Sequence, residues 1–249
     1  MEWFGGNYEK YSFISFSLSH WIMIGIFITG AIILFLWRKN LRQRNLRKLE
    51  ILLALSLLLF EISYHLWAMN IGIWHISDSL PLELCSFSLF LTAALLLTKK
   101  RLIFEIVFFT SLLGASQAIA TPVLDFGFPH FRFWHYFYTH LVIIWIALYF
   151  VWVKDYYPTI WSVLKVFIFL NILLPIILFI NKLVDGNYMF LNYKPVGGSL
   201  LDYLGPHPWY ILSLEGLLIG LSIITWLIFR NWRHKQPENY LTNHRGKTR

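Results

Sequence analysis

The chain has 249 residues, of which 57% are hydrophobic, 19% aromatic and 14% charged, and its formal net charge is +8. A soluble domain carries charges on about a quarter of its residues, so this composition excludes an ordinary soluble enzyme and indicates a polytopic membrane protein. The positive charge requires no nucleic acid partner, because the basic residues lie beside apolar stretches, where anionic lipids of the cytoplasmic leaflet would bind them.

Several apolar stretches are close to the length that a helix needs to cross a hydrocarbon core of about 30 Å. The sequence predicts an all-α, polytopic helical bundle, with residues 1–232 as a single transmembrane domain and 233–249 as a polar, basic tail. We expect no signal peptide, because the chain starts without a basic segment and a small-residue cleavage site. The predicted spans are 13–37, 50–70, 82–98, 102–121, 133–153, 160–181 and 209–229.

Lys and Arg are distributed unevenly between the two sets of alternate loops. Segments 38–48, 99–101 and 154–159 and the tail from Arg230 carry six, three, one and six of them. Because basic loops stay in the cytoplasm, we expect an outside N-terminus, a cytoplasmic C-terminus and seven crossings. The opposite set has four basic residues, namely Lys10, Arg132, Lys182 and Lys194.

Polar residues inside the predicted spans gather in the outer halves of the spans. Ionisable groups are costly within a membrane, so each of them is a candidate functional residue. Polar residues that only form contacts between helices would occur at all depths of the membrane. The concentration of polar residues in the outer half therefore predicts one polar cavity that opens outward. The candidates from five spans are Glu61, His65, Cys85, Gln117, His135, Tyr136, His140 and Glu215, together with Arg132 just before the fifth span.

Helical spacing brings some of these residues together. Glu61 and His65 are four residues apart, as are Tyr136 and His140, so each pair lies on one helix face. In the fourth span one face carries a polar stripe. The stripe consists of Gly114, Gln117 and Thr121.

A purely structural explanation exists for each candidate. A free cysteine in a helix, here Cys85, is often a packing residue, and Glu61 with His65 can form an interhelical hydrogen bond. We expect His135 to lie in the interfacial aromatic belt. Glu83, two residues before the cysteine, is expected to be a favourable charge at a helix N-terminus.

A thiol and an imidazole in one cavity also suit acyl transfer. An imidazole or a helix N-terminus favours the thiolate, which attacks an ester carbonyl to give a thioester that a second alcohol resolves. Cys85 is predicted near the glycerol-ester level of the outer leaflet, a depth that suits a membrane lipid ester. From the residues alone, packing and catalysis both stay open for Cys85.

Three segments, LPLELCSFSLF, GASQAIATPVLDFGFPHFRFWHYFYTH and PHPWYILSLEG, resemble the YwaF-type family of bacterial integral membrane proteins, over about residues 12–230. That family is related to a eukaryotic transmembrane family of cysteine-dependent phospholipid acyltransferases, and more distantly to membrane hydrolases with a Thr–His pair. The resemblance implies that Cys85 is the nucleophile. It implies His140 as the partner histidine, with His135 as the alternative, in a multi-pass protein of the bacterial plasma membrane.

The resulting hypothesis is a lipid acyltransferase or acyl-ester hydrolase that acts in the outer leaflet. We expect membrane lipid as substrate, anionic lipids at the cytoplasmic basic loops, and no cofactor or metal. Gln117 is a candidate oxyanion donor, while His65 and Glu215 would orient other groups. A transporter or sensor with a structural cysteine is the alternative, and a metal-dependent hydrolase has no supporting motif.

Overall fold

The computed structural model describes residues 2–6, 11–195 and 200–230 and is all-helical apart from one isolated bridge, between Ser12 and Phe126. The predicted tail 233–249 and Lys10 lie outside the described residues. The helices are α1 (Leu18–Arg42), α2 (Arg47–Asn70), α3 (Leu84–Thr98), α4 (Arg101–Phe109), the π-helical segment η3 (Thr110–Ala115), α5 (Ser116–Ala120), α6 (Phe131–Trp152), α7 (Ile160–Val184) and α8 (Trp209–Arg230). Short 3₁₀ helices are η1 (Glu2–Phe4), η4 (Tyr188–Phe190) and η5 (Leu200–Leu204).

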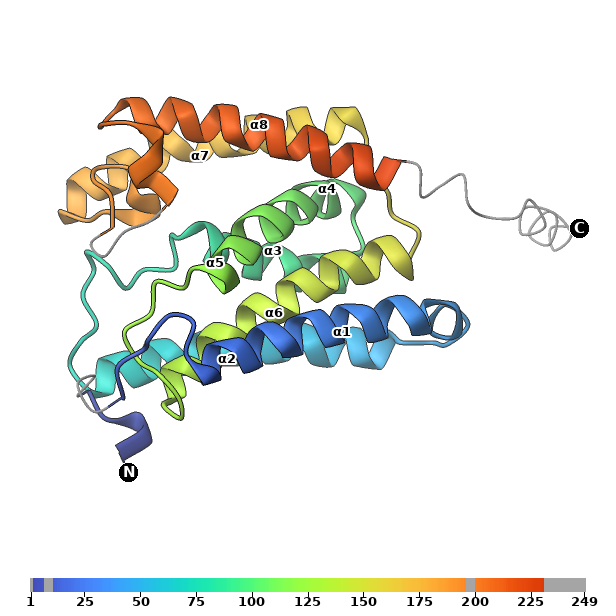
Figure 1. Ribbon diagram of the computed structural model, residues 1–249, viewed down its shortest axis with the longest axis horizontal. Coiled ribbons are helices and arrows are strands. Elements are labelled where there is room, and N and C mark those ends of the chain that lie inside the picture. Colours follow the sequence, from blue (N-terminus) through green and yellow to red (C-terminus); the bar gives the residue numbers. More distant parts are fainter. Residues whose placement is uncertain (1, 7–10, 196–199, 231–249) are drawn as a thin grey trace, which may run out of the picture.

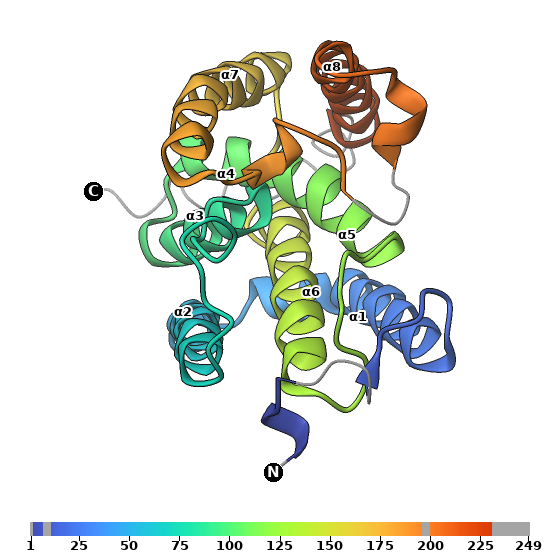
Figure 2. The same cartoon turned by 90° about the vertical axis from the view of Figure 1, so that its left-hand side faces the viewer.

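Helix α6 lies in the centre of the bundle (Figures 1 and 2). It packs against α1, α2, α3, α4 and α5. In its most apolar stretch 83% of the residues are buried, compared with 11% in α1 and 6% in α8. The peripheral helices leave their Leu, Ile, Phe and Trp side chains exposed, as helices do when lipid rather than protein covers them.

In the described part of the chain six helices are long and apolar enough to cross a membrane, which agrees with the polytopic, all-α prediction. The third predicted span is the exception, because α3 has 15 residues and a length of about 22 Å. After α2 the chain runs through an irregular segment, residues 71–83, before α3 begins (Figure 1). The number of crossings and the direction of the termini therefore stay predictions.

The first helix begins five residues later than predicted, at Leu18 instead of residue 13. The preceding residues are apolar, but they follow the α5–α6 connection instead of continuing the helix. Phe13 donates its backbone N–H to the carbonyl of Asp125 over 2.9 Å. Backbone pairing therefore decides the start of α1, which a hydropathy pattern does not reveal.

His130 caps the N-terminus of α6 and joins it to the beginning of the chain. Its Nδ1 accepts the backbone N–H of Arg132 over 3.1 Å, so Nε2 carries the proton and donates to the carbonyl of Gly5 over 3.0 Å. The ring stacks on Phe126 with a centroid separation of 4.2 Å. Burial lowers the pKa of His130, and both ring nitrogens are satisfied only in the neutral form.

At the opposite, basic end, buried carboxylates join neighbouring helices. Glu50 of α2 is 2% exposed, accepts a hydrogen bond of 2.7 Å from the Tyr149 hydroxyl of α6, and pairs with Lys154 over 2.7 Å. Glu105 of α4 pairs with Lys165 of α7 over 2.5 Å. Hydropathy and spacing do not predict the Glu50 cluster, because the residue lies at the predicted border of a span.

Gly30 allows α1 and α6 to approach closely. A Cβ atom at this position would lie 2.3 Å from Cζ2 of Trp145. The indole cannot move away freely, since its Nε1 donates to the carbonyl of Phe27 over 3.2 Å.

We predict that Gly30→Ala destabilises the protein by about 1–3 kcal/mol, because the added methyl group overpacks the α1–α6 contact. Gly25→Ala on the same helix is the matched control, since a Cβ there meets nothing within 4 Å. Thermal unfolding of both purified variants in detergent provides the measurement. Equal melting temperatures for the two variants would contradict the close contact.

His130 makes the stability of the protein depend on pH. Because the pKa of His130 in the folded protein lies below its ordinary value of 6.5, the unfolded chain binds the proton more readily. The contribution of His130 to stability is therefore complete above pH 6.5 and decreases as the pH falls. Relative to His130→Asn, which keeps a capping oxygen but does not titrate, the wild type should lose melting temperature between pH 6.5 and 5. Parallel pH curves for the two proteins would show that His130 is not responsible.

Candidate functional site

A cavity of about 460 Å³ has residues from the first turns of α3 and α6 in its lining. In Figure 1 the N-terminus lies at the same end of the bundle as the start of α6. Residues of α2, α3, α5, α6 and the α7–α8 connection line the cavity. His65 and Glu215, which were expected to contribute, are not among the lining residues. The predicted site residues that do line the cavity are Glu61, Cys85, Gln117, Arg132, His135, Tyr136 and His140.

Cys85 is the second residue of α3 and is partly exposed in the cavity. The helix starts here because Glu83 has an extended backbone and its carbonyl accepts the first helical hydrogen bond, from Phe87 over 3.1 Å. The side chain of Glu83 makes no capping hydrogen bond to α3. The thiol therefore lies at the positive end of a helix whose first N–H groups have no side-chain cap.

Glu83 is at the helix start, as predicted, but its carboxylate serves another segment. One oxygen accepts the backbone N–H of Met189 over 3.0 Å. The neighbouring Tyr188 hydroxyl accepts the N–H of Leu80 over 2.8 Å and donates to the carbonyl of Ile76 over 2.7 Å. These bonds hold the α7–α8 connection beside the cavity.

His140 is 8% exposed, and its own helix determines its tautomer. Nδ1 lies 2.6 Å from the carbonyl oxygen of Tyr136, one turn earlier. A carbonyl only accepts, so Nδ1 carries the proton and Nε2 is left with a lone pair. The Tyr136 ring, 4.2 Å away between centroids, is fixed in turn because its hydroxyl donates to the carbonyl of Ala118 over 2.9 Å.

His135 is 5% exposed and lies inside the protein, so the expectation of a position in the aromatic belt was wrong. Its ring stacks on Tyr64 with centroids 5.0 Å apart. Nη1 of Arg132 donates to Nδ1 of His135 over 2.8 Å, which places the imidazole proton on Nε2. That nitrogen faces a carboxylate oxygen of Glu61 at 3.5 Å.

The predicted pair of Glu61 and His65 is present, with 3.6 Å between carboxylate oxygen and Nε2. Nδ1 of His65 accepts the indole N–H of Trp74 over 3.1 Å. His65 therefore connects the carboxylate to the segment that follows α2 and does not reach the cavity. Its role in this geometry is to position Glu61.

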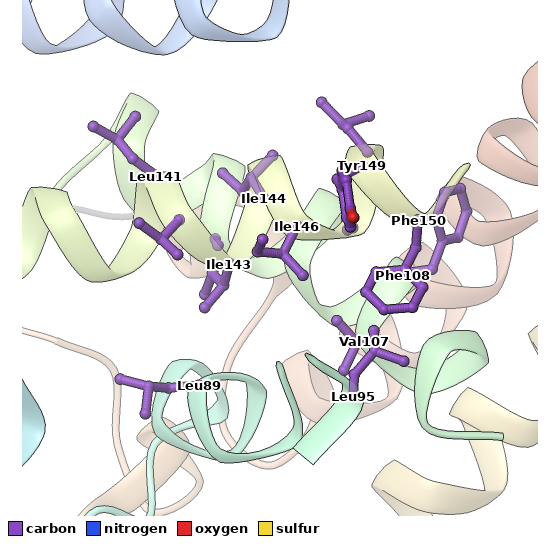
Figure 3. Packing of buried hydrophobic residues seen from close by; sticks show 14 of the residues in the cluster. Leu89, Leu95, Val107, Phe108, Leu141, Ile143, Ile144, Ile146, Tyr149 and Phe150 are labelled. Carbon is purple, nitrogen blue, oxygen red and sulfur yellow. The ribbon is translucent and has the colours of Figure 1, made fainter. Parts of the chain in front are cut away.

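An apolar layer separates the cavity from the basic end of the bundle. Leu89 and Ile143 line the cavity and also belong to the main hydrophobic cluster. Figure 3 shows that the labelled cluster residues beyond them, including Val107, Phe108 and Phe150, carry hydrocarbon or aromatic side chains. Phe108 and Phe150 are fully buried.

Sequence reasoning missed two lining residues that helical spacing could have identified. Tyr64 follows Glu61 by three positions, and Thr139 follows His135 by four. The Thr139 hydroxyl donates to the carbonyl of His135 over 2.9 Å and stays on that face. Within residues 2–6, 11–195 and 200–230, no three His, Cys, Asp or Glu side chains are placed to hold a metal ion.

The chain was compared with known protein families, curated proteins and solved structures. The model of the TMEM164 family matches residues 15–226. No curated protein and no solved structure matches the chain. All the residues that line the cavity lie within the matched segment.

The position of Cys85 predicts how a thiol reagent reaches it. A small, negatively charged, membrane-impermeant methanethiosulfonate should label the protein in intact cells, because the cavity is expected to open outward. Mass spectrometry of the purified protein measures one adduct per chain, since Cys85 is the only cysteine. Cys85→Ser provides the unlabelled control, and labelling that occurs only after permeabilisation would contradict the outward opening.

Proposed function

The chain belongs to the TMEM164 family, and from this premise we propose that it is a membrane-embedded lipid acyltransferase or acyl-ester hydrolase. Cys85 is the nucleophile and His140 the general base. The observation that carries the proposal is that both side chains line one cavity, while the bond from Nδ1 of His140 to Tyr136 leaves Nε2 as the acceptor. A thiol and an imidazole of this tautomer in one cavity are the minimum requirement for covalent acyl transfer.

In the first half-reaction, Nε2 of His140 takes the thiol proton while the sulfur of Cys85 attacks the ester carbonyl carbon. The tetrahedral intermediate then breaks the bond to the ester oxygen, and the departing alcohol takes the proton back from His140. In the second half-reaction, Nε2 deprotonates an acceptor hydroxyl, which attacks the thioester. The thiolate leaves and regains that proton, and water in place of the acceptor gives hydrolysis.

The negative charge of the tetrahedral oxygen needs hydrogen-bond donors. The amide of Gln117 lines the same cavity and donates one hydrogen bond, of 2.7 Å, to the Thr121 hydroxyl. A primary amide carries two N–H bonds, so one is left for the oxyanion. The uncapped first turn of α3, which contains Cys85, offers backbone N–H groups beside the sulfur.

The proposal includes an arrangement in the membrane. In this arrangement the six long helices and the shorter α3 cross a bacterial plasma membrane, with the N-terminus outside, so that the cavity meets the ester level of the outer leaflet. The basic loops then bind anionic lipids of the cytoplasmic leaflet. The distribution of Lys and Arg between alternate loops supports this orientation.

A transporter or sensor is the alternative. A transport path must continue to the other side, whereas Leu89, Ile143 and the fully buried Phe108 lie between the cavity and the basic end. This apolar layer favours chemistry within the cavity over passage through it.

The test of the proposal is the acyl-enzyme intermediate. Incubation of the purified protein with membrane lipid extract should add an acyl mass to Cys85 that hydroxylamine removes, and Cys85→Ser should show none. His140→Gln should slow acylation about 10²–10⁴-fold, the usual contribution of a general base. The rate is measured by intact-protein mass spectrometry.

His75→Gln is the matched control, because this histidine is exposed and does not line the cavity. Equal acylation rates for His140→Gln and His75→Gln would reject His140 as the base. A wild type that never carries an acyl group would reject covalent catalysis by Cys85.

A further inference from the structure

We propose that Arg132 binds the phosphate group of the lipid substrate and thereby sets the position of the acyl ester beside Cys85. This inference rests on the proposed function for the ester chemistry, but the binding of phosphate is a separate property of the same cavity. The phospholipid class itself is what the family resemblance implies, and the inference is that Arg132 is the residue that binds its phosphate.

The first observation is that the cation of Arg132 has no carboxylate partner among the residues that the structure describes. Its side chain lines the cavity and, within the described part of the chain, makes one hydrogen bond, to the neutral His135. Arg132 is also the second residue of α6, at the positive end of a helix, where a cation is unfavourable. Within residues 2–6, 11–195 and 200–230, no carboxylate forms an ion pair with this guanidinium, which can therefore accept an anionic ligand.

The carboxylates that line the cavity are committed to other partners. Glu61 faces the imidazoles of His135 and His65, at 3.5 Å and 3.6 Å. Asp78 accepts the Ser79 hydroxyl over 2.6 Å. Glu83 accepts the N–H of Met189. None of them lies within 4 Å of Arg132, so the positive charge faces the cavity without direct neutralisation.

The surroundings of Arg132 hold its guanidinium in one orientation. The guanidinium carbon lies 4.5 Å from the centre of the Tyr64 ring and 5.8 Å from that of Tyr136. Cation–π contacts of this kind fix the plane of the group without using its N–H bonds. His135 takes one N–H and is itself held by Glu61, which leaves most of the donor fork for a phosphate.

Tyr136 lies near both Arg132 and His140 and so connects the proposed anion site with the catalytic pair. The Tyr136 ring lies 5.8 Å from the Arg132 guanidinium on one side and 4.2 Å from the His140 ring on the other. These two steps limit the separation between the anion-binding group and the base. In a glycerophospholipid only a few covalent bonds separate the phosphate from the nearer ester carbonyl, so one molecule can reach both.

The experiment measures binding to the full chain in detergent, in a Cys85→Ala background so that the ligand is not consumed. Dihexanoylphosphatidylglycerol is compared with dihexanoylglycerol, which has the same acyl chains and no phosphate, and with inorganic phosphate. Isothermal titration is performed for the background protein and for Arg132→Gln, Arg132→Lys and Lys182→Gln. Lys182 is the matched control, because it is exposed, lies on the same predicted side and does not line the cavity.

We expect the background protein to prefer the phospholipid to the glyceride. Arg132→Gln should weaken phospholipid binding about tenfold to a hundredfold, the effect of charge-assisted hydrogen bonds. Arg132→Lys should recover part of the loss, since it keeps the charge but not the fork. Lys182→Gln should bind as the background does, and glyceride binding should not change in any variant.

Two results would overturn the proposal. One is equal affinity of the background protein for phospholipid and glyceride, which needs no variant and so does not depend on the folding of Arg132→Gln. The other is inorganic phosphate binding as tightly as the phospholipid, which would assign the site to the free ion. If phospholipid binding depends on Arg132 but Cys85 never becomes acylated in the otherwise unmodified protein, the anion site stands and the proposed catalysis fails.

Discussion

The architecture depends on one constraint, that a charge placed between apolar helices must find its partner inside the bundle. Helix α2 is attached to the central helix α6 by two such charges. Glu50 meets Tyr149 at the basic end, and Glu61 faces His135 at the cavity end. Between them Ser56 of α2 and the hydroxyl of Tyr138 of α6 also form a hydrogen bond, so polar contacts at three levels fix the register of the two helices. The cavity lies at the Glu61 end of α2 and α6, which is polar and open. At the opposite end, Lys99 and Lys154 pair with Glu50 and close the space between the helices.

Much of the fold followed from the sequence, because hydropathy and charge operate over the length of a helix. The spans built on α2, α6, α7 and α8 were located within a few residues. The structure differs from the prediction where a backbone hydrogen bond determines the start of a helix. Phe13 pairs with Asp125 instead of extending α1. It differs again at α3, whose composition is apolar enough for a span but whose length is not. Hydropathy reports what surrounds a segment and not how far the segment extends.

The candidate site was predictable in its depth and partly in its members. Seven of the nine proposed residues line one cavity because polar groups at similar depth on neighbouring helices have to face inward. Sequence spacing did not distinguish the two histidines, which depend on contacts with different chemistry. His135 accepts a hydrogen bond from Arg132 at its Nδ1, whereas His140 donates from the same atom to a backbone carbonyl. Only the structure distinguishes the imidazole of His135, which lies between Arg132 and Glu61, from that of His140, whose Nε2 has a free lone pair.

The π-helical segment η3 determines which residue of its span faces the cavity. A wide turn of this kind holds one residue more than an α-helical turn, which rotates everything after it by about 100° relative to a regular helix. Before the segment, Phe108 and Phe109 are buried in the core, and after it Gln117 faces the cavity. Without the additional residue, the side chain of Gln117 would point about 100° away from its present direction and would not face the cavity.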